Sequence, residues 1–430
     1  MSIEELHALF LQHPVVTTDS RKCPLGSIFF ALKGEKFDGN QFVSKALESG
    51  CSYAVIDNPE YSSGERTILV DNVLKTLQEL ACYHRSQLHI PVIGITGTNG
   101  KTTTKELISA VLRKRYNVLY TEGNYNNSIG VPLTLLRLNA EHEIAVIEMG
   151  ASHPGDIKEL VEIAKPDFGL ITNVGRAHLE GFGSFEGVIK TKGELYDFIR
   201  SVSGTIFIDK DNLHLVMMSH GINQITYGSD GTASVNGLVV ECNPYLIFIW
   251  GQGDNRSVVK THLIGSYNLG NVLSAVTVGL RFGVKVEDIN LAIEEYVPSN
   301  NRSQLMKTER NTLIIDAYNA NPSSMKAALD NFKAQKISPK AVILGDMMEL
   351  GPDSDNLHEE TLSQIVGAHF DKVFLCGSHF SKVAANNPSV ETYETTETLM
   401  AALEAKPLSG CNILIKGSHS MGLERIVPLL

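Results

Sequence analysis

The stretch "GITGTNGKTTTKELISAVL", residues 94–112, has the pattern of a buried strand, a glycine-rich turn and an amphipathic helix. Backbone N–H groups at such a turn and at the start of the helix have no partner within the helix, so several of them can donate to one phosphate. Lys101 adds a positive charge there, and the Thr102 hydroxyl can hold Mg²⁺. The stretch therefore predicts a nucleotide-binding loop.

This loop departs from the usual spacing G-x4-G-K-[ST]. That spacing requires glycine at position 95, where the chain has Ile95, and the glycines fall at positions 94, 97 and 100 instead. A GK[ST] triplet alone arises often by chance, but its place between a buried strand and an amphipathic helix is more specific. We interpret the loop as a variant phosphate-binding loop, and the alternative is a glycine turn with a structural role only.

Strands and helices on both sides of the loop indicate an α/β protein of three domains. Residues 1–88 combine short apolar strands with Gly, Asp and Lys, which predicts a small N-terminal α/β domain. Residues 89–298 alternate strands with helices and predict a central P-loop domain with a parallel sheet, with a less regular stretch at 204–262. The segment "YVPSNNRSQ" predicts a linker and hinge near Pro298, and residues 299–430 predict a Rossmann-like domain.

Composition limits the partners that the chain can have. The net charge is −11, and no basic run with interleaved aromatic residues appears, so a general nucleic-acid binder is disfavoured. The N-terminus has acids where a signal peptide has basic residues, and apolar runs such as "YLIFIW" at 245–250 are too short to span a bilayer. Six scattered cysteines without a CxxC pair indicate reduced thiols. We expect a cytoplasmic protein with no membrane insertion.

Two polar residues lie where predicted strands of the central domain end. Glu148 interrupts the apolar strand "IAVIEMG", and His178 follows the next strand in "TNVGRAHLEGFGS". Ligands of open α/β sheets bind at this edge, and a carboxylate there indicates a bound cation. The alternatives are an ordinary capping or loop acid for Glu148 and a packed, hydrogen-bonded histidine for His178.

Lys192 in "EGVIKTKGELYDFI" is predicted to face the core. At 100° per residue it lies in the middle of an apolar stripe, whereas Lys190 points to the opposite side. The other members of the stripe are Val188, Leu195, Tyr196 and Ile199. One interpretation is a long stem that reaches solvent at the domain edge. The other is a buried, neutral amine that can add CO₂ and become a carbamate.

Together, "TGTNGKTTTKEL", "GNYNNSIGVPLTLL", "VIEMGAS", "NVGRAHLEGFGS" and "KTKGEL" resemble the Mur ligases, ATP-dependent enzymes that add amino acids to the cytoplasmic peptidoglycan precursor. The form TGTNGKT is similar to that family's own loop, so Ile95 is no obstacle. The later segments "NNRSQ", "DAYNANPSSM", "GDMMELG" and "KGS" resemble the member that joins D-alanyl-D-alanine to UDP-N-acetylmuramoyl-tripeptide. The resemblance covers all three predicted domains and implies a reaction through an acyl phosphate.

The resemblance also implies cofactors and site residues by position. The implied cofactors are ATP and Mg²⁺, with a carbamylated lysine at Lys192. The implied catalytic groups are Lys101, Glu148, His178 and Lys192. The implied Mg²⁺ ligands are Thr102 with Glu148, and His178 with Lys192. The implied ATP-binding residues are Gly97, Thr98, Asn99, Gly100, Lys101, Thr102, Thr103, Asn268, Asn271, Arg302, Asp316, Tyr318, Asn319 and Pro322. The implied contacts to the uridine-nucleotide substrate come from Ser20, Arg21, Asn126 and Asn127.

Two other functions stay open at this point. One is a Mur-type or folylpolyglutamate-type amide ligase that acts on a different precursor. The other is a nucleotide-gated binding protein, which would explain the phosphate loop but not a core-facing lysine near candidate metal ligands. The C-terminal acids Asp346 and Glu349 are interpreted as strand-end or capping residues, and His358 as a positioning group at most. The working unit is expected to be a monomer.

Overall fold

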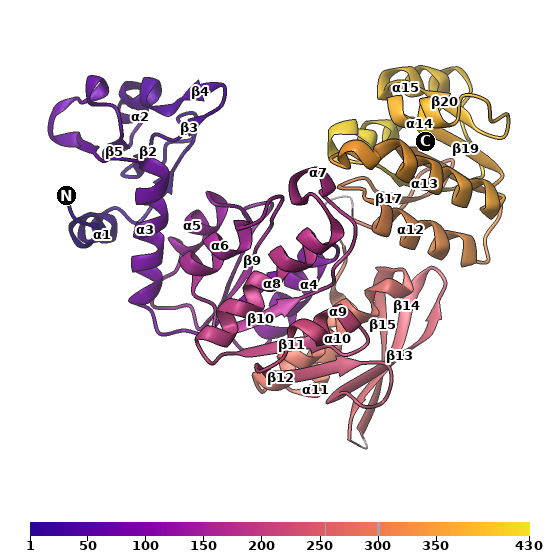
Figure 1. Ribbon diagram of the computed structural model, residues 1–430, viewed down its shortest axis with the longest axis horizontal. Helices are drawn as coiled ribbons and strands as arrows, with labels where there is room; N and C mark the ends of the chain where they lie inside the picture. The colour runs from indigo at the N-terminus through magenta and orange to yellow at the C-terminus, as the bar shows by residue number, and fades with distance from the viewer. Residues whose placement is uncertain (254, 299–301) are drawn as a thin grey trace.

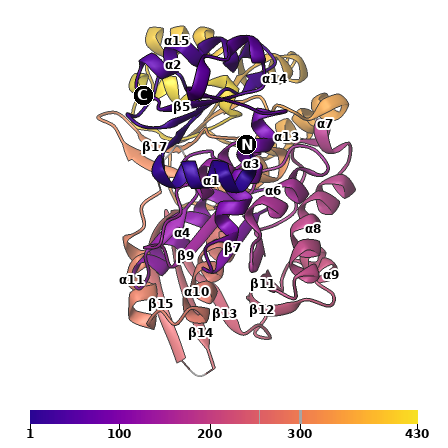
Figure 2. The ribbon, with the colours of Figure 1, turned by 90° about the vertical axis from the view of Figure 1, so that its left-hand side faces the viewer.

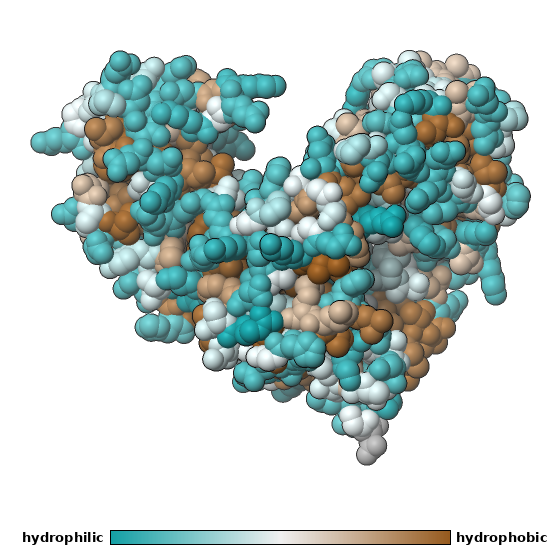
Figure 3. Space-filling view, in the orientation of Figure 1, coloured by the Kyte–Doolittle hydropathy of each residue, from teal (hydrophilic) through white to brown (hydrophobic). Residues whose placement is uncertain are grey.

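The structure is a computed structural model that describes residues 1–253, 255–298 and 302–430. The chain forms three lobes, each with its own sheet, and the N-terminal and C-terminal lobes stand on opposite sides of the central one (Figure 1). The space-filling view shows the surface hollowed between these two outer lobes (Figure 3). The predicted α/β class with three domains is confirmed. The predicted boundary between residues 298 and 299 lies next to residues 299–301, which are outside the described part of the chain. This boundary and the one between residues 88 and 89 both stay predictions.

The N-terminal lobe has a four-stranded parallel sheet in the order β1-β2-β5-β6. Its strands are Val16–Thr17 (β1), Ile28–Phe30 (β2), Tyr53–Ile56 (β5) and Thr67–Leu69 (β6), and the hairpin strands are Lys33–Gly34 (β3) and Phe37–Asp38 (β4). Its helices are Ile3–Gln12 (α1), Val43–Glu48 (α2) and Val73–Ser86 (α3). Helix α3 also packs against α5 and α6 of the central lobe. One apolar core therefore continues from the first lobe into the second.

A pair of buried histidines joins α1 to α3, which lie against each other (Figure 2). His7 Nε2 lies 3.0 Å from His84 Nδ1, and His84 Nε2 lies 2.9 Å from the carbonyl oxygen of Leu138 in the central lobe. The carbonyl can only accept, so His84 Nε2 carries a proton and its Nδ1 accepts from His7. Burial lowers the pKa of both imidazoles. The charge of His84 lowers the pKa of His7 further, and the hydrogen bond to Leu138 raises the pKa of His84 in part. The pair is therefore held neutral.

We expect this pair to make stability fall in mild acid. Because the pKa of each histidine is lower in the folded chain than its usual value of about 6.5, the unfolded chain binds more protons as the pH falls below 6.5. The free energy of unfolding should then fall by up to about 1.4 kcal/mol per pH unit for each imidazole. Urea denaturation at several pH values should show a shallower slope in a His7→Gln/His84→Gln variant. The slope should be unchanged in His89→Gln, since His89 is exposed.

The central lobe has a nine-stranded sheet in the order β15-β14-β13-β12-β11-β10-β7-β9-β8. Its first strands are Val92–Thr96 (β7), Val118–Tyr120 (β8), Ile144–Glu148 (β9), Phe168–Ile171 (β10), Thr205–Asp209 (β11) and Asn223–Gly228 (β12). The last three are Val235–Cys242 (β13), Tyr245–Gln252 (β14) and Asn255–Ile264 (β15). From β8 to β13 in the sheet order, neighbouring strands run parallel, whereas β14 is antiparallel to both β13 and β15.

The predicted parallel sheet is confirmed for β8 to β13 in the sheet order, and the antiparallel strands β14 and β15 extend it. The stretch 204–262, predicted as less regular, contains strands β11 to β14 and most of β15. In β15 buried and exposed residues largely alternate, because these hairpin strands are covered on one face only. Short alternating strands give a weaker sequence signal than the continuous apolar runs of buried parallel strands.

Helices cover both faces of the parallel part of this sheet. One face carries Lys101–Arg113 (α4), Leu269–Arg281 (α10) and Val286–Glu295 (α11), which pack on one another. The other face carries Gly130–Leu135 (α5), Asp156–Ala164 (α6) and Phe185–Ser201 (α8). Two short helices, Leu179–Phe182 (α7) and Leu213–Met218 (α9), complete the lobe. The parallel part of the sheet is therefore enclosed between two layers of helices.

The C-terminal lobe has a six-stranded sheet in the order β16-β17-β21-β18-β19-β20, in which only β16 runs antiparallel to its neighbour. Its strands are Gln304–Lys307 (β16), Thr312–Asp316 (β17), Lys340–Gly345 (β18), Lys372–Cys376 (β19), Glu391–Tyr393 (β20) and Asn412–Lys416 (β21). Its helices are Pro322–Ala334 (α12), Ser354–Ala368 (α13), Ser378–Val383 (α14) and Thr396–Ala405 (α15). Among the described residues, no helix combines the length and the apolar character that crossing a membrane requires.

Candidate active site

A cavity of about 840 Å³ lies between the central and C-terminal lobes. On the central side it is lined by the phosphate loop, by the ends of β9 and β10 and by the start of α10. On the C-terminal side it is lined by residues just before β16, by the ends of β17 and β21 and by the start of α12. It therefore meets the carboxyl edges of two sheets, which is where open α/β sheets bind ligands.

The phosphate loop joins β7 to α4 and requires glycine at two positions. Gly97 has φ +142° and Gly100 has φ +80°. A Cβ atom on Gly97 would lie 2.0 Å from Thr172 Oγ1, and one on Gly100 would lie 2.7 Å from Asn271 Oδ1. The loop is also tied to the end of β10, because Asn99 N donates to Asn173 Oδ1 at 3.0 Å. The geometry leaves the N–H groups of the first turn of α4 without partners inside the helix.

Lys101, the first residue of α4, curls back over the loop. Its Nζ donates to the carbonyl oxygens of Gly97 at 2.7 Å and Thr98 at 3.0 Å. Burial lowers the pKa of Lys101 to about 8, Glu148 raises it in part, and Arg302 lowers it further. Arg302 comes from the C-terminal lobe, and its guanidinium lies 3.7 Å from the ring centroid of Tyr318. Two cations from different lobes thus line one cavity, which suits a polyanionic ligand.

Glu148, the last residue of β9, has the chemistry of a cation ligand. It is 1% exposed, and its Oε1 accepts from Thr102 Oγ1 at 3.2 Å and from Asn126 Nδ2 at 2.9 Å. Its Oε2 is buried with no hydrogen-bond partner. An unpartnered carboxylate oxygen beside a hydroxyl fits Mg²⁺, which proteins commonly bind through one or two carboxylates together with substrate phosphates. The described residues contain no cluster of three or more His, Cys, Asp or Glu that could hold a metal ion alone.

His178 lies at the boundary between the central and C-terminal lobes, within reach of the charge of Lys192. His178 lines the cavity and its Nδ1 contacts Glu349 Oε2 of the C-terminal lobe. Burial lowers the pKa of His178, and the charges of Lys101 and Lys192 lower it further. The carboxylate of Glu349 raises this pKa in part. This places His178 at the meeting point of two lobes.

Lys192 faces the interior of the central lobe, as its helical position predicts. It is 2% exposed, whereas Lys190 is exposed. Its Nζ lies 5.4 Å from the ring centroid of Phe182. Burial, followed by the charge of Lys101, lowers the pKa of Lys192 well below its usual value. The neutral amine is therefore favoured, although Lys192 is not among the described residues that line the cavity.

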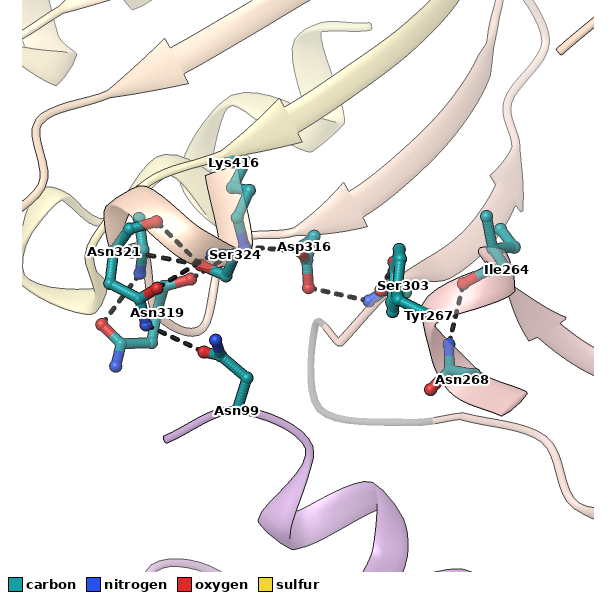
Figure 4. Close-up of polar contacts among 11 residues, drawn as sticks. Asn99, Ile264, Tyr267, Asn268, Ser303, Asp316, Asn319, Asn321, Ser324 and Lys416 are labelled. Atoms are coloured by element: carbon teal, nitrogen blue, oxygen red, sulfur yellow. Dashed lines mark hydrogen bonds and ion pairs between the residues drawn. The ribbon is translucent and has the colours of Figure 1, made fainter. Parts of the chain in front are cut away.

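The C-terminal wall of the cavity is a hydrogen-bonded network (Figure 4). Asp316 Oδ2 accepts from Lys416 Nζ at 2.6 Å, and its Oδ1 accepts from Ser303 N at 3.1 Å. Asn321 Nδ2 donates to Asn99 Oδ1 at 2.8 Å and so joins this wall to the phosphate loop. The Asp316 bonds order the wall itself, and the Asn321 bond ties it to the phosphate loop.

Most of the site residues predicted from the sequence lie at this cavity. Those that line it are Thr98, Asn99, Gly100, Lys101, Thr102, Thr103, Asn126, Asn127, Glu148, His178, Asn268, Asn271, Arg302, Asp316, Tyr318 and Asn319. Those that do not line it are Gly97, Lys192, Pro322, Ser20 and Arg21. Pro322 is the first residue of α12, whose first turn contributes other residues to the wall. Arg21 is exposed in the N-terminal lobe and pairs with Asp19 at 2.9 Å.

Sequence reasoning missed several residues of the site. Asn173, Asn321, Lys416 and Glu349 each make a contact that shapes the cavity. Asn321, Glu349 and Lys416 belong to the segments "DAYNANPSSM", "GDMMELG" and "KGS". These segments carried the family resemblance, but no role at the cavity was predicted for the three residues.

Profiles of three domains match successive parts of the chain. The Mur ligase family catalytic domain matches residues 14–85, the Mur ligase middle domain residues 95–279, and the Mur ligase glutamate ligase domain residues 301–419. A UDP-N-acetylmuramoyl-tripeptide–D-alanyl-D-alanine ligase from Bacillus subtilis is 36% identical, over 96% of this chain and 92% of the relative.

Solved structures show the same architecture. A crystal structure of MurF from Acinetobacter baumannii has a TM-score of 0.88 and 30% identity, covering 96% of this chain and 92% of that one. A MurF ligase from Thermotoga maritima in complex with ADP has a TM-score of 0.86 and 26% identity, covering 97% of both chains.

Proposed function

This chain belongs to the Mur ligase family, and we propose that it joins D-alanyl-D-alanine to UDP-N-acetylmuramoyl-tripeptide at the expense of ATP. The observation that carries the proposal is the similarity to the Bacillus subtilis ligase, because it extends over 96% of this chain and so includes all three lobes. The product is a precursor of peptidoglycan. The proposed setting is the cytoplasm, and the proposed working unit is a monomer without a nucleic-acid partner.

ATP is proposed to bind in the cavity between the central and C-terminal lobes. The start of α4 and Lys101 would contact the phosphates from one side, and Arg302 from the other. Asn268 and Asn271, which also line the cavity, are proposed to approach the adenine. The remaining proposed contacts, to the ribose and base, are Asp316, Tyr318 and Asn319, with Pro322 starting the helix beside them. The cavity volume of about 840 Å³ is ample for a nucleotide and part of a second substrate.

The residues present fit Mg²⁺ near the phosphates. Thr102 and Glu148 would hold one ion, and His178 with a carbamylated Lys192 a second. When bound, Mg²⁺ supplies positive charge that offsets the repulsion between phosphate oxygens and an approaching carboxylate. Lys192 can form the carbamate because its buried neutral amine can attack CO₂, with a new N–C bond and release of one proton. The carbamate would turn a neutral position into an anionic one.

The proposed chemistry has two steps. A carboxylate and an amine do not condense in neutral water, so the terminal carboxylate of the tripeptide first takes the γ-phosphoryl group of ATP and ADP leaves. Lys101 would hold the transferring phosphoryl group. The free amine of D-alanyl-D-alanine then attacks the acyl phosphate, and phosphate leaves. Docking of the C-terminal lobe against the phosphate loop, through Asn321 and Asn99, would keep water away from the acyl phosphate.

The uridine nucleotide is proposed to extend from the cavity toward the N-terminal lobe. Asn126 and Asn127 line the cavity on that side, and Asn126 also donates to Glu148. Ser20 and Arg21 would contact the far end of the substrate, in the N-terminal lobe. The exposed Arg21 guanidinium is held by Asp19, so its remaining N–H groups are free to meet an anion.

Phosphate release with one component omitted at a time tests this function. We expect release from ATP only when Mg²⁺, the UDP-linked tripeptide and D-alanyl-D-alanine are all present. Equal rates without either peptide would contradict a ligase and would favour a nucleotide-gated binding protein. A panel of other amino acids and of folate substrates, added in place of the peptides, would identify a different amide ligase.

A further inference from the structure

Two loops from different lobes meet beside the cavity. The loop after β18 brings Glu349 to the loop before α7, where Glu349 Oε2 contacts His178 Nδ1. A second bond links the backbones, since Glu180 N donates to the carbonyl oxygen of Glu349 at 3.2 Å. The loops approach so closely that a Cβ atom on Gly351 would lie 3.4 Å from Glu180 Cα. This contact therefore involves both side chains and main chains.

The C-terminal lobe holds its loop rigidly. The buried imidazole of His358 accepts from Met347 N at 3.0 Å, and Ser418 Oγ accepts from Met348 N at 2.9 Å. Asp346 at the base of the loop bonds through its carbonyl oxygen to Ser418 N at 3.1 Å. Because His358 and Ser418 belong to different elements of the lobe, the loop must move together with the lobe.

Both partners adopt a backbone conformation that their side chains disfavour. His178 has φ +50° and Glu349 has φ +61°, in the left-handed region. Non-glycine residues are uncommon in this region and persist there where the surroundings demand it, often at functional sites. Here the two conformations direct the two side chains at each other across the lobe boundary.

The chemistry of the contact selects one form of the imidazole. An ionised carboxylate only accepts hydrogen bonds, so Nδ1 of a neutral His178 carries the proton and Nε2 keeps its lone pair. Histidines that bind metals usually donate their other ring N–H to a carboxylate or carbonyl oxygen in this way.

We propose that Glu349 is a positioning residue for His178, which fixes the tautomer and orientation of the ring only while the C-terminal lobe is docked. Docking of the lobe and completion of the candidate cation site are then one event. This inference rests on the proposed function, because it takes His178 as a cation ligand. Glu349 would thereby give the "GDMMELG" segment of the C-terminal lobe a role at a cation site of the central lobe.

Variants of the full chain test this role. Glu349→Ala should weaken binding of Mn²⁺, a paramagnetic substitute for Mg²⁺, about 10- to 100-fold in the presence of a non-hydrolysable ATP analogue, with a similar loss of kcat. The KM for ATP should change less than about threefold, because the phosphate loop is intact. Glu349→Gln keeps an oxygen acceptor and should restore part of the Mn²⁺ affinity. Glu360→Ala, an exposed acid on α13, is the matched control and should behave like the wild type.

A spectroscopic readout separates positioning from simple docking. In ¹⁵N-histidine-labelled protein with the ATP analogue, the His178 signals should show a protonated Nδ1, and Glu349→Ala should lose that pattern. Unchanged Mn²⁺ affinity together with an unchanged His178 pattern in Glu349→Ala would overturn the proposal, whether or not kcat falls. Neither readout needs a peptide substrate, so failure of the ligase function would be seen separately, in the omission assay.

Discussion

Lys101→Ala is expected to reduce turnover about 1000-fold or more while the fold persists. The Lys101 ammonium lies at the phosphate loop, and charge placed at a transferring phosphoryl group is worth several kcal/mol in the transition state. The variant loses two hydrogen bonds to loop carbonyl oxygens, which contribute roughly 1 kcal/mol each to stability. The loss should therefore appear in kcat and in ATP affinity far more than in the unfolding midpoint.

The measurement is steady-state phosphate release together with calorimetric ATP binding. Lys114→Ala is the matched control, because Lys114 lies just past the other end of α4 and pairs with Glu295 at 2.7 Å, away from the loop. Lys114→Ala should turn over within about twofold of the wild type, since exposed ion pairs contribute little. Near-normal turnover in Lys101→Ala would remove this loop from the chemistry.

The elements that the sequence predicted well are those decided by local pattern. The strand, turn and helix around residues 94–112 follow from apolar periodicity and glycine placement, and the structure has β7 and α4 there. The burial of Lys192 opposite the exposed Lys190 follows from helical periodicity alone. In both cases the residues whose pattern determines the structure lie within one or two helical turns of one another.

What the sequence could not predict depends on contacts between distant segments. Glu349 reaches His178 across 171 positions of sequence, and Asn321 reaches Asn99 across 222. Polar residues in such loops have ordinary roles as caps and turn formers, so their types alone do not single them out. The antiparallel strands β13–β15 escaped for a different reason, since short alternating strands resemble irregular structure in one sequence.

The N-terminal lobe shows a third limit. Ser20 and Arg21 were assigned to the uridine-nucleotide site by resemblance, and in the structure neither lines the cavity between the other two lobes. A substrate that extends over two lobes needs contacts that no single cavity contains. Their assignment stays a prediction that binding of a uridine diphosphate to Arg21→Ala would check.

Lys192→Ala is expected to lose about 100-fold or more in turnover, with Lys190→Ala close to the wild type. Lys192 is 2% exposed, and burial holds its pKa well below the usual lysine value, which favours the neutral amine that can bond to CO₂. The carbamate so formed would offer two anionic oxygens to a cation, which an uncharged amine cannot do. Lys190 has the same chemistry but is exposed on the other side of α8, so it controls for a general effect of removing a lysine from this helix.

Two further measurements separate a carbamate from an ordinary buried lysine. Acetate added to Lys192→Ala should restore part of the turnover, because a small carboxylate can occupy the vacated volume and present equivalent oxygens. In the wild type, ¹³C-labelled bicarbonate should give a carbamate carbonyl signal that Lys192→Ala lacks. Without the carbamate, Lys192 would present one uncharged amine nitrogen in place of two anionic oxygens. Absence of the ¹³C signal in fully active protein, together with normal turnover of Lys192→Ala, would therefore rule out the second proposed Mg²⁺ site.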